Sequence, residues 1–166
     1  MTGRKAPTGL RPEDDLIYET LNFIGIADQL MTTRANRVLA EGDLPFPQFV
    51  MLSHFSKDPG RRRTVNGVAS AFQAPQPGIT KTLAKLRKRG FVEMRAAEDD
   101  RRVREVWVTP AGLAAHRAAL KRITPDARLI FAGWDDADLQ RLHDLLERLK
   151  SWLDDNRDVR PPAHRP

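Results

Sequence analysis

The side chains best placed for chemistry in this chain lie on a short basic segment near its centre. Ile79, Leu83 and Leu86 share one face of a helical wheel that ends at Gly90, and polar side chains cover the other face. The candidate binding residues of this segment are Gln76, Thr80, Lys81, Lys85 and Lys88. Such a helix suits the major groove of duplex DNA, where its N-terminal side chains reach base edges and its later lysines reach phosphates. A solvated basic face without a partner is the alternative.

A β-hairpin with a charged tip is predicted directly after the basic segment. Residues 91–95 and 104–109 have the composition of two short strands, and a charged run at residues 98–102 separates them. The candidate DNA-contacting residues of this tip are Asp100, Arg101 and Arg102. Arginines at such a position can enter a minor groove, where they sense its width and negative potential. A solvated loop whose charges pair weakly with one another is the alternative.

The positive charge of the chain is concentrated in this same region. The 166 residues include 28 Lys and Arg against 22 Asp and Glu, which gives a formal net charge of +6. Residues 57–105 hold 13 of the basic residues and only 6 of the acidic ones, so the whole excess lies there. An excess confined to one unit indicates a phosphate-binding surface. The run Arg61–Arg63 in this region is equally compatible with a backbone contact and with a plain exposed loop.

Composition disfavours several other classes of function. The chain has no cysteine, so disulfides, thiolate metal sites and thiol redox chemistry are excluded. There is no glycine-rich phosphate loop and no nucleophile–base pair, so we expect neither an enzyme nor a cofactor. His54, His116, His143 and His164 are scattered and lack the spacing of a helical metal site. No apolar stretch resembles a signal peptide or a membrane span, which predicts a cytoplasmic protein without membrane association.

Helical periodicity dominates the rest of the chain. Apolar spacing over residues 13–40 predicts one long helix or two, and residues 48–55 should form a short buried helix. Helix starts are expected at Pro47, Thr64, Pro77, Thr109-Pro110 and Asp135. The helix that follows Pro110 should run to about Ile123, with an interruption or kink at Pro125.

The last predicted helix has an apolar stripe wider than a single contact face needs. Its members are Leu139, Leu142, Leu145, Leu146, Leu149, Trp152 and Leu153. Because the first helix is also long and apolar, we expect the two chain ends to pack together and against a second copy. For Trp107, Trp134 and Trp152, packing in a core or a dimer interface is favoured over a ligand pocket.

The order of these elements and two motifs resemble the multiple antibiotic resistance regulator (MarR) family of bacterial transcription factors. One motif is the hairpin tip Asp100-Arg101-Arg102 followed by Val106-Trp107-Val108-Thr109-Pro110-Ala111-Gly112, and the other is the basic helix from Ile79 to Val92. The resemblance covers about residues 13–155 by architecture and about residues 64–112 by motif. One departure is that Pro75 or Gln76 replaces the serine that usually opens the recognition helix.

The resemblance implies a mainly α fold with a single unit over residues 13–155. A winged helix-turn-helix with a small β-hairpin wing would occupy about residues 46–110. Dimerisation helices would flank it at about residues 13–41 and 111–155. Composition adds a flexible arm over residues 1–12 and a disordered tail over residues 156–166.

The resemblance also implies a function. It indicates a homodimeric, sequence-specific DNA-binding regulator, more often a repressor, that binds a pseudo-palindromic operator. Arg102 would enter the minor groove while Asp100 fixes its guanidinium. Small, often aromatic or anionic, effectors bind many members between the dimerisation helices and the DNA-binding lobe, and the residues identify none for this chain. A winged-helix module that presents its basic helix to an acidic protein is the alternative function.

Overall fold

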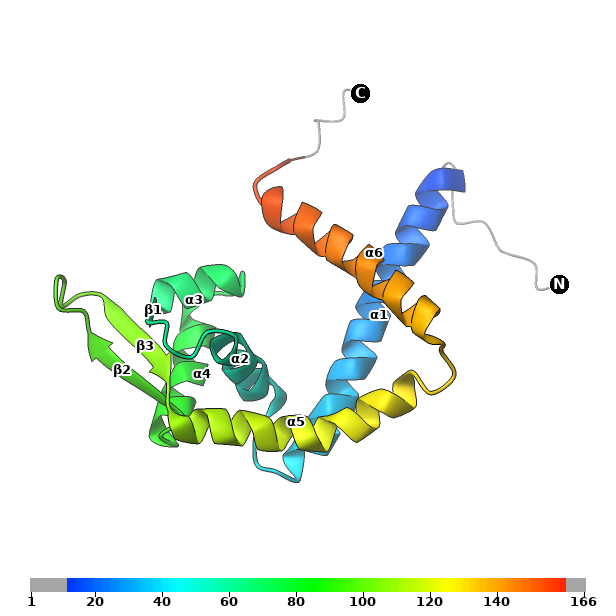
Figure 1. Ribbon diagram of the computed structural model, residues 1–166. Helices are drawn as coiled ribbons and strands as arrows, with labels where there is room; N and C mark the ends of the chain where they lie inside the picture. The colour runs from blue at the N-terminus through cyan, green and yellow to red at the C-terminus, as the bar shows by residue number, and fades with distance from the viewer. Residues whose placement is uncertain (1–11, 161–166) are drawn as a thin grey trace. The chain divides into compact units, whose positions relative to one another are not determined.

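The computed structural model describes residues 12–160, with side chains from residue 14 onward. Most of the predicted arm (residues 1–11) and the end of the predicted tail (residues 161–166) lie outside the described residues. The elements, shown in Figure 1, are α1 (Pro12–Ala40), α2 (Phe46–Ser56), β1 (Arg63–Thr64), α3 (Val65–Ala71), α4 (Gln76–Lys88), β2 (Val92–Ala96), β3 (Arg104–Val108), α5 (Pro110–Ile130) and α6 (Asp136–Asp155). The fold is mainly α with a small β-sheet, as predicted. The chain divides into two compact units, residues 1–124 and 125–166.

The first helix is continuous, where the sequence allowed either one helix or two. Its buried hydrophobic side chains, Ala35 and Leu39, lie near its C-terminal end. In the turn that follows, the Gly42 N–H donates to the Leu39 carbonyl at 3.0 Å and Asp43 has a φ of 53°. This turn leads the chain from an exposed helix into the core of the first unit.

Helix α2 is the most deeply buried helix of that core. Pro45 is its N-cap residue and Pro47 lies in its first turn, which confirms the predicted start. Its buried side chains are Gln48, Phe49, Met51, Leu52 and Phe55. Since nearly every side of α2 is apolar, it can be stable only when other elements surround it.

Helices α3 and α4 form a helix-turn-helix pair. The Thr64 hydroxyl accepts the Gly67 N–H at 2.9 Å, which confirms Thr64 as the N-cap of α3. The buried residues of α4 are the three predicted from its spacing, Ile79, Leu83 and Leu86. Because these side chains pack into the core, the opposite face of α4 is left to solvent.

A glycine ends α4 and turns the chain into the wing. Gly90 has a φ of 71°, and its N–H donates to the Arg87 carbonyl at 2.9 Å. The next N–H, that of Phe91, donates to the Leu86 carbonyl at 2.9 Å. These are the two hydrogen bonds of a Schellman motif, in which a residue with a Cβ would be strained.

The wing is built from β2 and β3, which pair antiparallel close to the predicted residue ranges. β1 pairs with the free edge of β3, so the strand order is β1-β3-β2. A strand of two residues is too short for alternation to reveal it, and the sequence did not predict β1. One face of the sheet joins the core through Val92, Val106 and Val108.

Helix α5 starts at the predicted cap but extends further than expected. The Thr109 hydroxyl accepts the Gly112 N–H at 3.1 Å and donates to the Gly90 carbonyl at 2.6 Å. The predicted end near Ile123 is wrong, since α5 continues through Pro125. A proline removes one intrahelical hydrogen bond, and that loss distorts a helix without always ending it.

The unit of residues 125–166 is dominated by α6. The Asp135 carboxylate accepts the Asp138 N–H at 2.7 Å, which confirms the predicted cap. No residue of α6 is buried, and the large exposed hydrophobic side chains of this helix are Leu139, Leu145, Leu146, Trp152 and Leu153. Among the described helices, none combines the length and apolarity that crossing a bilayer requires.

Candidate nucleic-acid interface

The solvent-exposed face of α4 carries all the helix residues for which the sequence predicted a DNA contact. These exposed residues are Gln76, Thr80, Lys81, Lys85 and Lys88. Lys81, Lys85 and Lys88 are four and three residues apart, so they form one stripe along the helix. Within the described part of the chain, none of these lysines forms an ion pair with a carboxylate. Their positive charge is therefore available to an external anion.

The tip of the wing is held in shape by Asp100. Its carboxylate accepts the backbone N–H of Arg102 at 2.8 Å, and its carbonyl accepts the N–H of Val103 at 2.9 Å. Arg101 and Arg102 are exposed and form no ion pair among the described residues. The tip thus presents two guanidinium groups on a turn that a neighbouring carboxylate orders.

The outer face of the wing engages one of the three consecutive arginines. Arg62 pairs with Glu105 at 3.3 Å, and its guanidinium lies 4.9 Å from the centre of the Trp107 ring. Arg95 lies 5.6 Å from the same ring. Trp107 is therefore half-buried beneath two cations and does not belong to the buried core.

The next arginine in the run has a structural role as well. Arg63 donates to the backbone carbonyls of Asp58 and Arg61 at 3.2 and 3.0 Å, and it lies 5.3 Å from the centre of the Phe55 ring. Arg62 and Arg63 thus stabilise the path of the chain into β1, and the exposed Arg61 is the member of the run with the fewest such contacts.

Solved structures with the same arrangement of elements are known. The transcriptional regulator BldR from Sulfolobus Solfataricus has a TM-score of 0.69 and 21% identity, over 84% of this chain and 99% of that one. A mutant of MarR from E. coli, complexed with operator DNA, has a TM-score of 0.70 and 19% identity, over 81% and 96%. A MarR protein from Peptoclostridium difficile DA00132 has a TM-score of 0.74 and 17% identity, over 94% and 97%. A search of curated protein sequences gave no significant match.

A sequence profile described as MarR family matches residues 42–103, the segment that contains α2, the helix-turn-helix and the wing tip. This part of the chain is similar to the MarR family. The resemblance recognised in the sequence is confirmed, and the chain shares its fold with these solved regulators over 81–94% of its length.

In the wing of this chain, Asp100 makes a different contact from the one that the resemblance implied. The expected partner was the Arg102 guanidinium, whereas the structure shows a bond to the Arg102 backbone N–H. An aspartate side chain is short and readily accepts a hydrogen bond from the backbone two residues ahead, as in an Asx-turn. The guanidinium of Arg102 is left free at the end of its long side chain.

Helix α4 lacks the serine that opens the recognition helix in the family it resembles, and the structure shows how α4 begins without it. Pro75 is the N-cap residue of α4 and provides no side-chain hydrogen bond. Its carbonyl accepts the Gly78 N–H at 3.0 Å. Pro77 lies in the first turn and has no N–H, so one donor fewer needs a partner there.

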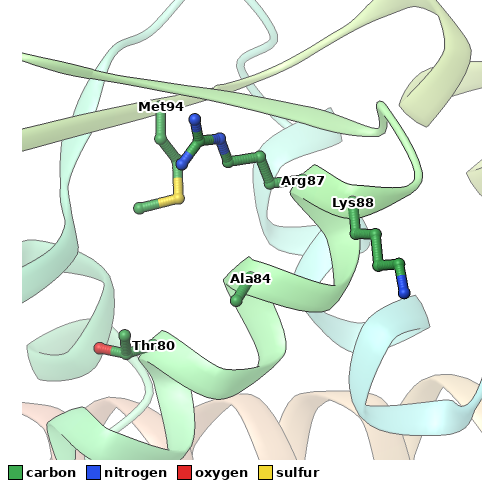
Figure 2. A pocket seen from close by; sticks show the side chains of 5 residues that line it. All are labelled: Thr80, Ala84, Arg87, Lys88 and Met94. Carbon is green, nitrogen blue, oxygen red and sulfur yellow. The ribbon is translucent and has the colours of Figure 1, made fainter.

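Arg87 is a candidate contact that the sequence analysis missed. It is exposed on α4 and, with Thr80, Ala84 and Lys88, lines a groove whose other wall is Met94 of β2 (Figure 2). The spacing contained a usable signal, because positions 80, 84 and 87 follow the i, i+4, i+7 pattern of one helix face. This stripe lies next to the one formed by the three lysines.

His116, a buried histidine of the first unit, is held by contacts within the fold. Nε2 of His116 lies 2.9 Å from the Ser53 hydroxyl, and its ring stacks on Phe49 at 5.4 Å. Burial lowers the pKa of His116, and the positive charge of Arg117 lowers it further. No cluster of three or more potential metal ligands occurs among the described residues. His164 lies outside them.

Proposed function

We propose that this protein is a sequence-specific DNA-binding transcriptional regulator that acts in the cytoplasm as a homodimeric repressor on a pseudo-palindromic operator. The observation that carries the proposal is the unpaired cationic face of α4 beside a wing tip with two unpaired arginines. In this arrangement Thr80 and Lys81 face base edges, and Lys85 and Lys88 face phosphates. Arg102 would enter the neighbouring minor groove.

The structural comparisons support DNA as the partner. The E. coli MarR mutant in complex with operator DNA has the same fold as this chain at a TM-score of 0.70. The chain also concentrates its positive charge on the winged helix, which is the part that the family profile matches. A partner with regularly spaced phosphates agrees with both observations.

Exposed apolar surface supports the homodimer. On α1, Leu16, Phe23 and Leu30 are 60%, 69% and 65% exposed. On α6, Trp152 and Leu153 are 58% and 52% exposed. Monomeric proteins rarely leave such continuous apolar helix faces in water, and burial against a second copy stabilises by about 25 cal/mol per Å². A two-fold axis would then place two recognition helices about one DNA turn apart.

Selection of bound sequences from a random duplex library tests the proposal. We expect an inverted repeat to be enriched by the wild-type protein and lost with the Lys85→Glu/Lys88→Glu double variant, whose exposed positions leave the fold intact. Absence of any enrichment, combined with capture of acidic proteins by the basic helix, would instead support the protein-interaction module.

Control by a small aromatic or anionic effector forms part of the proposal on the strength of the family resemblance. Its test uses the selected operator in a fluorescence-anisotropy assay, to which a panel of aromatic carboxylates is added. A ligand that releases DNA at constant salt, without a change in salt slope, would support the effector. Release that follows ionic strength alone would contradict it.

A further inference from the structure

A groove separates α4 from β2 and has a volume of about 460 Å³. Its lining residues are Thr80, Ala84, Arg87, Lys88 and Met94 (Figure 2). We infer that this groove holds one deoxyribose-phosphate unit of the DNA backbone and that Arg87 binds its phosphate. The inference rests on the proposed DNA-binding function and adds Arg87 and Met94 to a contact surface that already includes Thr80 and Lys88.

The charge of the groove suits an anion. None of its lining residues is acidic, and Arg87 forms no ion pair within the described residues. The arginine two positions later differs, since Arg89 donates to the carbonyl of Asp43 and lies 3.5 Å from its carboxylate. Of these two guanidinium groups, only that of Arg87 remains available. Its planar fork matches two phosphate oxygens at once.

The side chains of Arg87 and Lys88, which are adjacent in sequence, point in different directions. In Figure 2, Arg87 extends from α4 toward Met94, whereas the ammonium end of Lys88 points away from that side chain. Both residues line the groove, but their charged groups point in different directions. We assign the groove phosphate to Arg87 and a different phosphate to Lys88.

The apolar side chains that line the groove suit a sugar. Ala84 is small enough for a backbone to approach α4 closely, and Met94 is half-buried with its side chain against the core. The carbon atoms of deoxyribose can pack on these apolar groups. Thr80 lies at the N-terminal end of this lining, where it remains available for the base-edge contact proposed above. A bare inorganic anion has no carbon atoms to pack against Ala84 and Met94.

The geometry of duplex DNA identifies the occupant. When α4 lies in a major groove and the wing tip in the adjacent minor groove, the strand that separates the two grooves must pass between them. The space between α4 and β2 is the groove described above. A sugar-phosphate unit therefore has to lie in this groove, against Arg87 and the apolar side chains of Ala84 and Met94.

Phosphate neutralisation tests this assignment. In the selected operator, one phosphate at a time is replaced by an uncharged methylphosphonate, and the Kd is measured for the wild type and for Arg87→Ala. We expect several positions in each half-site to weaken wild-type binding, and the phosphate bound by Arg87 to do so about tenfold. Arg87→Ala should bind native DNA about tenfold more weakly per half-site, with a salt slope smaller by about 0.9 per half-site, and should be insensitive to methylphosphonate at that position alone.

Arg141→Ala is the matched control, because Arg141 is an exposed helical arginine on α6, outside the winged helix. It should keep the wild-type pattern at every phosphate. An Arg87→Ala protein that stays sensitive at every position would overturn the inference, provided its unfolding midpoint equals that of the wild type. Failure of the wild type to bind any duplex would contradict the proposed function itself, so the two failures are distinguishable.

Discussion

The carboxylate of Asp100 accepts the backbone N–H of Arg102, so at the residue scale this aspartate orders the wing tip through the backbone and not through the guanidinium. Asparagine keeps an acceptor oxygen at the same place but removes the charge. We therefore expect Asp100→Asn to bind operator DNA nearly as well as the wild type, and Asp100→Ala about fivefold more weakly, since it loses a hydrogen bond worth about 1 kcal/mol. Equal losses in the two variants, measured by anisotropy, would point to a charge-based role.

The pH dependence of stability also follows from single residues. Burial holds the pKa of His116 below the usual histidine value of 6.5, so the unfolded chain binds this proton more readily. Stability should be full above pH 6.5 and should decrease as the pH falls from 6.5 toward the lowered pKa. Burial and the charges of Arg63, Lys57 and Arg61 lower the pKa of His54 as well, which adds a loss of the same sign.

Unfolding midpoints between pH 5 and 8 test this dependence. His116→Gln, which can keep a hydrogen bond to Ser53, should show a shallower loss in acid than the wild type. His54→Gln should also show a shallower loss, because burial and the charges of Arg63, Lys57 and Arg61 lower the pKa of His54. A wild-type midpoint that rises in acid would contradict the assigned direction.

At the scale of elements, the start of α5 depends on a glycine. A Cβ at Gly112 would overlap the Phe91 carbonyl and would lie 2.9 Å from a Val108 methyl group. We expect Gly112→Ala to lower the free energy of unfolding by about 1–3 kcal/mol, because backbone cannot move aside cheaply. The matched control is Gly78→Ala on α4, where a Cβ meets nothing within 4 Å. That variant should be about 0.5 kcal/mol more stable in chemical denaturation.

The elements that the sequence predicts well are those with local causes. The N-caps at Thr64 and Asp135 and the buried face of α4 depend on neighbours within one or two turns, and all were expected. β1 depends on pairing across about 40 residues, and no local pattern marks it. The continuation of α5 through Pro125 depends on how well the surrounding helix tolerates one lost hydrogen bond, which the sequence does not show.

The candidate site also contains residues whose role the sequence predicts and residues whose role depends on distant partners. The lysines of α4 could be named because amphipathicity alone places them outside the core. The sequence could not show whether Arg62 contacts a phosphate or stabilises the fold, because its partner Glu105 is 43 residues away. The part played by Arg87 became visible only when β2 supplied the opposite wall of its groove.

At the scale of the whole molecule, the proposed function requires two winged helices to act together. No residue of α6 is buried within the described chain, although this helix has a continuous apolar stripe. We expect the wild type to sediment as a dimer and the Leu146→Glu/Trp152→Glu double variant as a monomer, because two carboxylates would have to enter an apolar interface.

The charge-matched control for this experiment is Gln140→Glu/Ser151→Glu, on the polar side of α6, which should remain dimeric. The monomeric variant should keep its affinity for a single half-site, because the winged helix folds in residues 1–124. On the full operator it should lose the gain from simultaneous engagement of two half-sites, on the order of 100-fold or more. A monomer that binds the full operator as tightly as the wild type would show that each winged helix acts alone, and the pseudo-palindromic operator would then have no physical basis.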